Sequence, residues 1–222
     1  MLDQIYILPI LLFSVVIHEV SHGYMALRLG DPTARDMGRL TLNPIPHIDP
    51  VGSILVPLFS LFVAGQVFIA WAKPVPVNPM NFSNYRRDDI LVSVVGPLSN
   101  ILLALVCTLC FIAVSFFGLL FHEPSAIVIQ AFDFFLRMFW GGIVLNIKLA
   151  VFNMIPIPPL DGSHVVASLL PDETAERFRS IGFYGVFIIL LLMRWPPFYN
   201  LFGGIVGTLM VPFIMLKQLF LG

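Results

Sequence analysis

The sequence predicts an all-α protein that crosses a membrane several times. Of its 222 residues, 58% are hydrophobic and 11% are charged, and the mean hydropathy is +0.93. A soluble domain is about 45–50% apolar and about 25% charged, and a chain of this length cannot bury so much apolar surface in one core. Soluble, disordered and collagen-like classes are therefore excluded. With 12 basic and 13 acidic residues, the chain also lacks the polybasic patch that nucleic-acid binding requires.

Six apolar runs are candidates for membrane segments, because a spanning helix needs about 20 mostly apolar residues. Polar, proline-rich joints separate them, and we find no internal repeat or low-complexity tail. We therefore predict a single integral membrane domain over residues 1–222, with a core at about 5–170 and a C-terminal helical pair at 181–220. The runs are Ile5–Leu29, Val51–Trp71, Ile90–Phe121, Ala126–Met154, Ile181–Met193 and Phe198–Phe220.

The first run is predicted to be a retained membrane helix. It has no basic n-region and no clear small-residue cleavage site, and Asp3 is the only charge before Glu19. A signal peptide would carry both features and would not contain a His-Glu pair within its apolar stretch.

The second run, Val51–Trp71, is predicted to enter the membrane and return to the same side. If all six runs span, the basic residues of the joints divide six to four, which favours neither orientation. If Val51–Trp71 re-enters, nine lie on one side and only Arg194 on the other, as the positive-inside rule expects. Five spanning helices, one re-entrant segment and an external N-terminus follow, giving five to six membrane helices in all. The nine are Arg28, Arg35, Arg39, Lys73, Arg86, Arg87, Arg177, Arg179 and Lys217.

Two joints predict a small membrane-associated β element. Gly38–Asn43 alternates apolar and polar residues, as a short strand does. The prolines of Trp71–Asn78 (WAKPVPVN) hold that segment extended. We expect the two to pair beside the membrane.

His18-Glu19-Val20-Ser21-His22 carries the chemistry. It matches H-E-x-x-H, and on a helix the two histidines share a face, so both imidazoles can reach one cation. Glu19 is placed to take a proton from metal-bound water. With 5 His and 4 Glu, a shuffled chain would give about 0.002 such matches (218 × 5/222 × 4/222 × 5/222). The alternative, two core histidines beside a buried carboxylate, is weak because ionisable residues in a membrane helix are expensive and usually functional.

Asp161 is the candidate third ligand, since zinc usually takes three protein ligands and a water. It lies in Asn153–Gly162 (NMIPIPPLDG), where prolines end a helix and hold the following backbone extended, and Gly162 permits a tight turn. His18 lies about halfway or more along the first helix, towards its Leu29 end. With Val51–Trp71 re-entrant, Asp161 emerges on the same side as that end. The alternative is an ordinary loop aspartate that caps the stretch Gly162–Leu170.

Together these motifs resemble the site-2 protease family of intramembrane zinc metalloproteases. HEVSH, GPLSN (Gly96–Asn100) and NMIPIPPLDG carry the resemblance, in order, over roughly residues 14–170. Gly30–Gly52 and Trp71–Pro79 resemble compact bacterial and archaeal-type members, and the chain has no room for a PDZ or CBS domain. The resemblance implies that His18, His22 and Asp161 bind one Zn²⁺ and that Glu19 is the catalytic carboxylate.

Four further residues have two interpretations each. The resemblance makes Asn153 a catalytic candidate whose amide donates to a developing oxyanion, and interhelical hydrogen bonding is its alternative. Asn100 is a candidate for substrate binding or for structure, and the neighbouring Gly96 allows another backbone to approach. His47 either has a specific contact, with the metal or with Asp49, or is a surface loop residue, which we favour. His164 is either a partner of a ligand or a helix-start residue, which we favour.

We therefore expect an intramembrane zinc metalloendopeptidase that cleaves transmembrane segments of membrane proteins, as in regulated intramembrane proteolysis. Glu19 would activate the zinc-bound water, and an open strand edge at Gly38–Asn43 and Trp71–Asn78 would hold the unwound substrate. We expect a multi-pass protein of the prokaryotic cell (inner) membrane with its site towards the cytoplasm. Its partners would be lipid and a transmembrane substrate. The rival functions are a metal-ion transporter that uses the His/Asp cluster as a transit site, and a non-catalytic scaffold with a structural metal.

Overall fold

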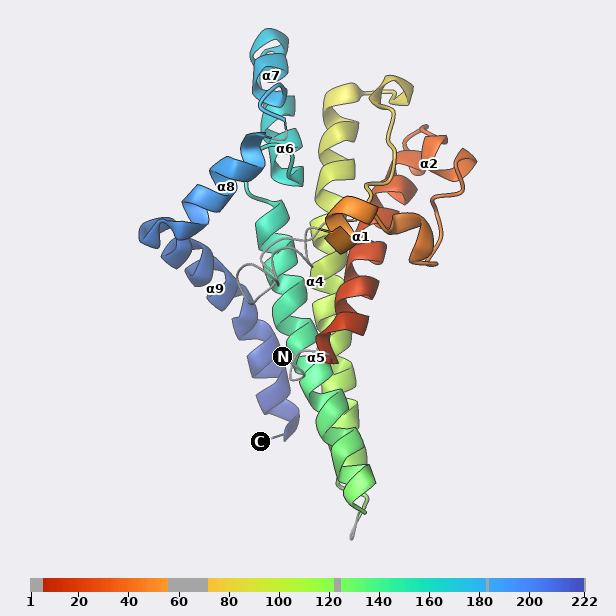
Figure 1. Ribbon diagram of the computed structural model, residues 1–222, viewed down its shortest axis with the longest axis vertical. Coiled ribbons are helices and arrows are strands. Elements are labelled where there is room, and N and C mark those ends of the chain that lie inside the picture. Colours follow the sequence, from red (N-terminus) through yellow and green to blue (C-terminus); the bar gives the residue numbers. More distant parts are fainter. Residues whose placement is uncertain (1–5, 56–71, 122–124, 183, 222) are drawn as a thin grey trace.

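The computed structural model describes residues 6–55, 72–121, 125–182 and 184–221, and in these residues every regular element is helical. Four helices are long and apolar enough to cross a membrane: α1 (Leu8–Arg28), α4 (Tyr85–Gly118), α5 (Ala126–Asn153) and α9 (Pro196–Leu221). Figure 1 shows them as a splayed bundle, with α2 (Thr33–Asp36), α6 (Asp161–Leu169) and α7 (Asp172–Arg179) at one end. The polytopic all-α prediction is confirmed, whereas the count of five to six membrane helices is not.

The centre of the bundle is the antiparallel pair α4 and α5, which α9 joins on one side. Its core consists of buried apolar side chains from all three helices. Small residues allow the close approach, as is usual in membrane bundles: a Cβ on Gly142 would lie 2.8 Å from the sulfur of Cys107. The core residues are Ala104, Cys107, Ile143, Ile147, Val206 and Met210.

The C-terminal region differs from the predicted spanning pair. Helix α8 (Tyr184–Arg194) has 11 residues and is therefore about 16 Å long, well short of a membrane core of about 30 Å. Figure 1 shows a bend between α8 and α9, and α9 then runs beside α5 towards the end where α4 gives way to α5. Pro196 and Pro197 begin α9; prolines suit a helix start but cannot continue a preceding helix.

Lys217 on α9 lies far from the basic residues with which the charge count grouped it. Its ammonium group is 4.9 Å from the ring centroids of both Phe111 and Trp140. Phe111 follows Arg87 by 24 residues on α4, which is about 36 Å along the helix. The position of Lys217 does not affect the grouping of the other eight basic residues in that count.

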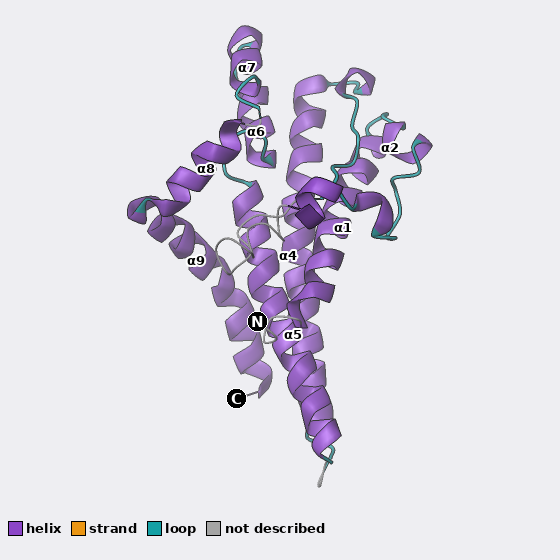
Figure 2. Cartoon of the chain, viewed as in Figure 1, coloured by secondary structure: helices purple, strands orange, loops and turns teal. Residues whose placement is uncertain are grey.

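The predicted β element is not confirmed, because Gly38–Asn43 and residues 72–78 form no ladder (Figure 2). Pro74 has no N–H to contribute to one. Instead, the Arg39 guanidinium donates from Nη2 to the carbonyls of Lys73 and Pro74, at 2.9 and 3.3 Å. Of the predicted re-entrant segment Val51–Trp71, only Val51–Leu55 is described, as part of the short π-helix Pro50–Leu55, and residues 56–71 lie outside the described residues.

Candidate metal centre

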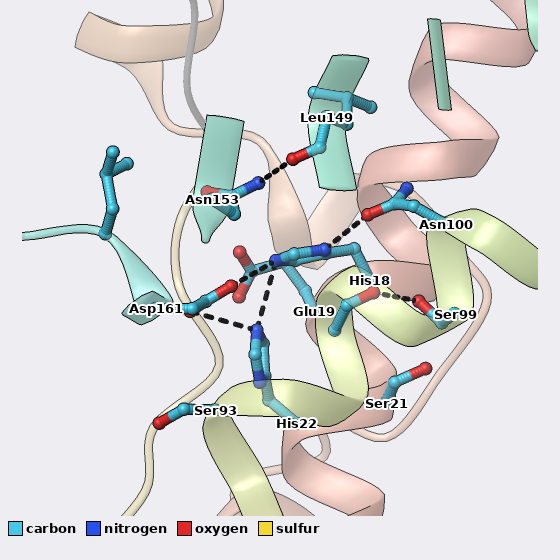
Figure 3. Close-up of polar contacts among 12 residues, drawn as sticks. His18, Glu19, Ser21, His22, Ser93, Ser99, Asn100, Leu149, Asn153 and Asp161 are labelled. Carbon is cyan, nitrogen blue, oxygen red and sulfur yellow. Dashed lines mark hydrogen bonds and ion pairs between the residues drawn. The ribbon is translucent and has the colours of Figure 1, made fainter. Parts of the chain in front are cut away.

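His18, His22 and Asp161 meet at one point between α1 and α6. The two imidazole Nε2 atoms are 3.1 Å apart. Asp161 Oδ2 lies 3.2 Å from Nε2 of His18, and Asp161 Oδ1 lies 3.4 Å from Nε2 of His22 (Figure 3). Their ligand atoms all lie within 4.8 Å of one another. The structure therefore brings together the three residues that the sequence predicted, although Asp161 follows His22 by more than 130 residues.

The loop between α5 and α6 is a rigid mount for Asp161. Its backbone folds on itself, with Ile157 N–H donating to the carbonyl of Ile155 at 2.8 Å. Gly162 lies so close to this loop that a Cβ there would be 2.3 Å from the Met154 carbonyl oxygen. Asp161 is the first residue of α6. The carboxylate is thus held by backbone packing.

Helix α4 forms the wall behind the histidines. A Cβ on Gly96 would lie 2.4 Å from Nε2 of His22 and 2.8 Å from Cε1 of His18. The close approach expected at this glycine is therefore made by two imidazole rings and not by another backbone.

A chain of buried amides fixes the proton on His18. Its Nδ1 lies 2.6 Å from Asn100 Oδ1, Asn100 Nδ2 donates to Asn146 Oδ1 at 3.0 Å, and Asn146 Nδ2 donates to the Gly142 carbonyl at 2.9 Å. Because that carbonyl can only accept, the direction of the whole chain is set and His18 Nδ1 carries a hydrogen. Both asparagines are fully buried.

His22 has the same tautomer for the same reason. Its Nδ1 lies 2.7 Å from the carbonyl oxygen of Val92, one turn before Gly96 on α4, and this acceptor requires an N–H. When neutral, both imidazoles therefore present Nε2 lone pairs to the same point as Asp161.

This convergence of electron-pair donors fits a cation. Two Nε2 lone pairs 3.1 Å apart cannot hydrogen-bond to each other when each ring proton is on Nδ1. Asp161 Oδ2 is also buried without a hydrogen-bond partner among the described residues. Two imidazole nitrogens and a carboxylate form a donor set that catalytic zinc takes, with a fourth position left for water or substrate.

Glu19 lies beside the ligands on α1 (Figure 3). The backbone N–H of Val75 donates to its Oε2 at 2.8 Å. This hydrogen bond therefore fixes Oε2, and among the residues that the structure describes none donates a hydrogen bond to Oε1.

The remaining candidate residues from the sequence differ in their contacts. Asn153 donates one amide N–H to the Leu149 carbonyl of its own helix at 3.0 Å. Asn100 is buried against His18. His47 is 2% exposed and donates from Nε2 to the Thr41 carbonyl. The prediction that His47 is a surface residue is therefore wrong, because its ring is buried and forms a hydrogen bond within its own loop.

His164 faces a polar cluster that sequence reasoning missed. Its Nδ1 is 3.3 Å from Oδ1 of the buried Asp89 on α4. Asp89 Oδ2 accepts a hydrogen bond from Ser168 and lies 3.6 Å from Arg179 Nη2. The cluster docks α6 and α7 on α4. Its signal in the sequence was a pair of acidic residues at the start of an apolar run. For Asn146, the signal in the sequence was an amide side chain within an apolar run.

Residues 6–193 of the chain match the sequence model of Peptidase family M50. The chain belongs to this family, the site-2 protease family. The M50 peptidase is 38% identical over 193 residues to "Putative zinc metalloprotease YwhC" of Bacillus subtilis, covering 86% of this chain and 81% of the relative. It is 29% identical over 201 residues to "Putative zinc metalloprotease Rip2" of Mycolicibacterium smegmatis, covering 88% of this chain and 69% of the relative.

No solved structure matches the M50 peptidase. Family and relatives together make it a metalloprotease, a hydrolase whose cofactor is zinc. It is a compact member of its family.

Proposed function

We propose that this M50 peptidase is an intramembrane endopeptidase that hydrolyses a peptide bond within the transmembrane segment of another membrane protein, in regulated intramembrane proteolysis. The observation that carries the proposal is the position of the site: His18, Glu19 and His22 lie within α1, one of the four helices long and apolar enough to span a membrane. A peptide bond that is cleaved at this site must therefore lie at the depth of a membrane helix.

Each residue has a role in the reaction. His18, His22 and Asp161 would hold the zinc ion, which supplies Lewis-acid polarisation of the scissile carbonyl and lowers the pKa of water towards about 7. Glu19 takes a proton from the attacking water at Oε1 and returns it to the leaving amine. Asn153 keeps a second amide N–H, beyond the one on Leu149, to donate to the oxyanion.

The proposed binding of the substrate backbone uses fewer groups than an open strand edge would offer. A transmembrane helix hides its peptide groups in its own hydrogen bonds, so the substrate must unwind locally. Of residues 73–76, Lys73 and Val75 already donate their N–H groups to His47 and Glu19, and Pro74 and Pro76 have none. Because Arg39 already donates to the carbonyls of Lys73 and Pro74, the carbonyl of Val75 would be the acceptor that this segment offers to the substrate backbone.

We place the site towards the cytoplasm of a prokaryotic cell (inner) membrane. Asp161 is the first residue of α6, which lies with α2 and α7 at one end of the bundle (Figure 1), and this end also carries most of the basic residues of the joints. Basic residues collect on the cytoplasmic side. We further propose a single domain over residues 1–222, with a catalytic core at about 5–170 and the C-terminal helices 181–220 outside it.

The test uses a set of tagged single-pass membrane proteins reconstituted with the M50 peptidase in proteoliposomes. The wild-type protein should cleave at least one member within its transmembrane segment, and Glu19→Gln should abolish cleavage while zinc stays bound. Cleavage that persists in Glu19→Gln contradicts the proposal. Zinc flux into the vesicles that tolerates Glu19→Gln would instead establish a metal-ion transporter.

A further inference from the structure

Residues 72–78, which we call the strap, run past α1 without regular secondary structure. Within Lys73-Pro74-Val75-Pro76-Val77, proline fixes the backbone and restricts the residue before it to an extended conformation. Because prolines have no N–H, Val75 carries the single amide hydrogen between Lys73 and Val77. That hydrogen is donated to Oε2 of Glu19 at 2.8 Å.

Buried groups fix the first part of the strap. Arg39, which is 7% exposed, donates to the carbonyls of Lys73 and Pro74. Lys73 N–H donates to the carbonyl of His47 at 2.9 Å. The strap therefore reaches Val75 from a fixed point.

The middle and the far end of the strap are fixed as well. The Val75 side chain is buried against α1, where a Cβ on Gly23 would lie 2.6 Å from its Cγ1. At the far end, the fully buried Asp31 accepts the N–H of Asn78 at 2.7 Å. Contacts on both sides of Val75 thus determine where its amide points.

We propose that the backbone amide of Val75 is a positioning group for Glu19 in the reaction. It holds Oε2 and so turns Oε1 towards the metal centre, where the proton must be taken. A glutamate has three side-chain torsions, and fixing one oxygen removes most of that freedom before the substrate arrives. The inference rests on the proposed function, in which Glu19 is the base.

A merely structural role would make a different prediction. If the hydrogen bond served only to hold the strap, its loss would lower the stability of the fold. Arg39, His47 and Asp31 hold the strap independently of Glu19, so we expect the loss to appear in kcat and not in stability.

The experiment replaces the Val75 amide by an ester, by incorporating 2-hydroxyisovaleric acid at position 75 of the full chain. This exchange removes one N–H and keeps the side chain. The same exchange at Val77 is the matched control, because it leaves the bond to Glu19 intact. Val75→Pro and Val77→Pro form a second, genetically encoded pair. The reporter is a tagged protein that the wild-type enzyme cleaves.

We expect the Val75 ester to lower kcat at least about tenfold, with KM, zinc content and the thermal midpoint unchanged. The Val77 ester should keep wild-type kcat. In a Glu19→Asp background, where the shorter side chain withdraws from Val75, the ester should add little further loss, which is the non-additivity of two groups that act together.

Three results would overturn the inference. The first is unchanged kcat in the Val75 ester. The second is a raised KM with unchanged kcat, which would make the amide a substrate contact. The third is loss of zinc or of stability, which would make it structural. Cleavage by Glu19→Gln would overturn the proposed function itself; an inactive Glu19→Gln with a fully active Val75 ester overturns only this inference.

Discussion

Gly96 of α4 supports the imidazole of His22 at contact distance, so that a Cβ at the glycine would lie 2.4 Å from Nε2. The Val92 carbonyl of the same helix holds the other ring nitrogen at 2.7 Å. Helix α4 therefore both orients the ring and limits its movement, although α4 itself supplies none of the three ligand residues. Mutations in α4 at the contacts with the histidine rings should then lower zinc affinity as strongly as some mutations of the ligands themselves.

Gly96→Ala should displace both imidazoles, because the added methyl group has no space on the ring side of α4. We expect zinc affinity to fall by about 10- to 100-fold, as when a group that orients a ligand is removed, and cleavage to fall with it. Competition with a chelator measures the affinity. Gly203→Ala is the control, since a Cβ there meets nothing within 4 Å. Unchanged zinc affinity in Gly96→Ala would show that the rings do not rest on α4.

Asn100→Leu should leave the Nδ1–H of His18 buried without an acceptor. The ring would lose the partner that fixes its tautomer, and we again expect zinc to bind about 10- to 100-fold more weakly. Asn146→Leu, one step further along the same chain of hydrogen bonds, should have a smaller effect in the same direction. If Asn100→Leu instead raises KM and leaves zinc bound normally, Asn100 is a substrate contact.

Asp31→Asn should destabilise the protein in a pH-dependent way. Burial raises the pKa of Asp31, but hydrogen bonds from Thr33, Asn78 and Asn81 outweigh it and hold the pKa below its usual value. A folded-state pKa below the unfolded value of about 3.9 means that the stabilisation is complete above that value and is lost as pH falls through the folded pKa.

At pH 7 we therefore expect Asp31→Asn to cost about 1.5–3 kcal/mol, the range for hydrogen bonds to charged groups. The difference in unfolding midpoint between Asp31→Asn and wild type should shrink below about pH 4, as read from denaturation in detergent at a series of pH values. A difference that stays constant down to pH 2 would contradict this account of Asp31.

The sequence predicted the metal ligands because their geometry is local or follows from membrane depth. His18 and His22 share a helix face by spacing alone, and Asp161 follows from the side on which its loop emerges. Asn100 was visible as the last residue of GPLSN and as a polar residue in an apolar run, but nothing in the sequence says which face of α4 meets α1. Its contact with His18 needed the packed structure.

The features that sequence reasoning missed depend on backbone and on helix direction. Val75 contributes through its N–H, which leaves no signal in its side chain, and the prolines around it favoured an extended segment without showing that it would not form a ladder. At the C-terminus, hydropathy alone does not distinguish a spanning helix from the short α8 followed by a bend at Pro196.

The most direct test of the central claim is the zinc coordination of the purified wild-type protein, measured by X-ray absorption at the zinc edge and compared with Asp161→Ala. We predict one zinc ion per chain with two imidazole nitrogens and oxygen donors, and loss of tight binding in Asp161→Ala. Zinc that stays bound in Asp161→Ala with an unchanged spectrum would contradict a centre built from His18, His22 and Asp161.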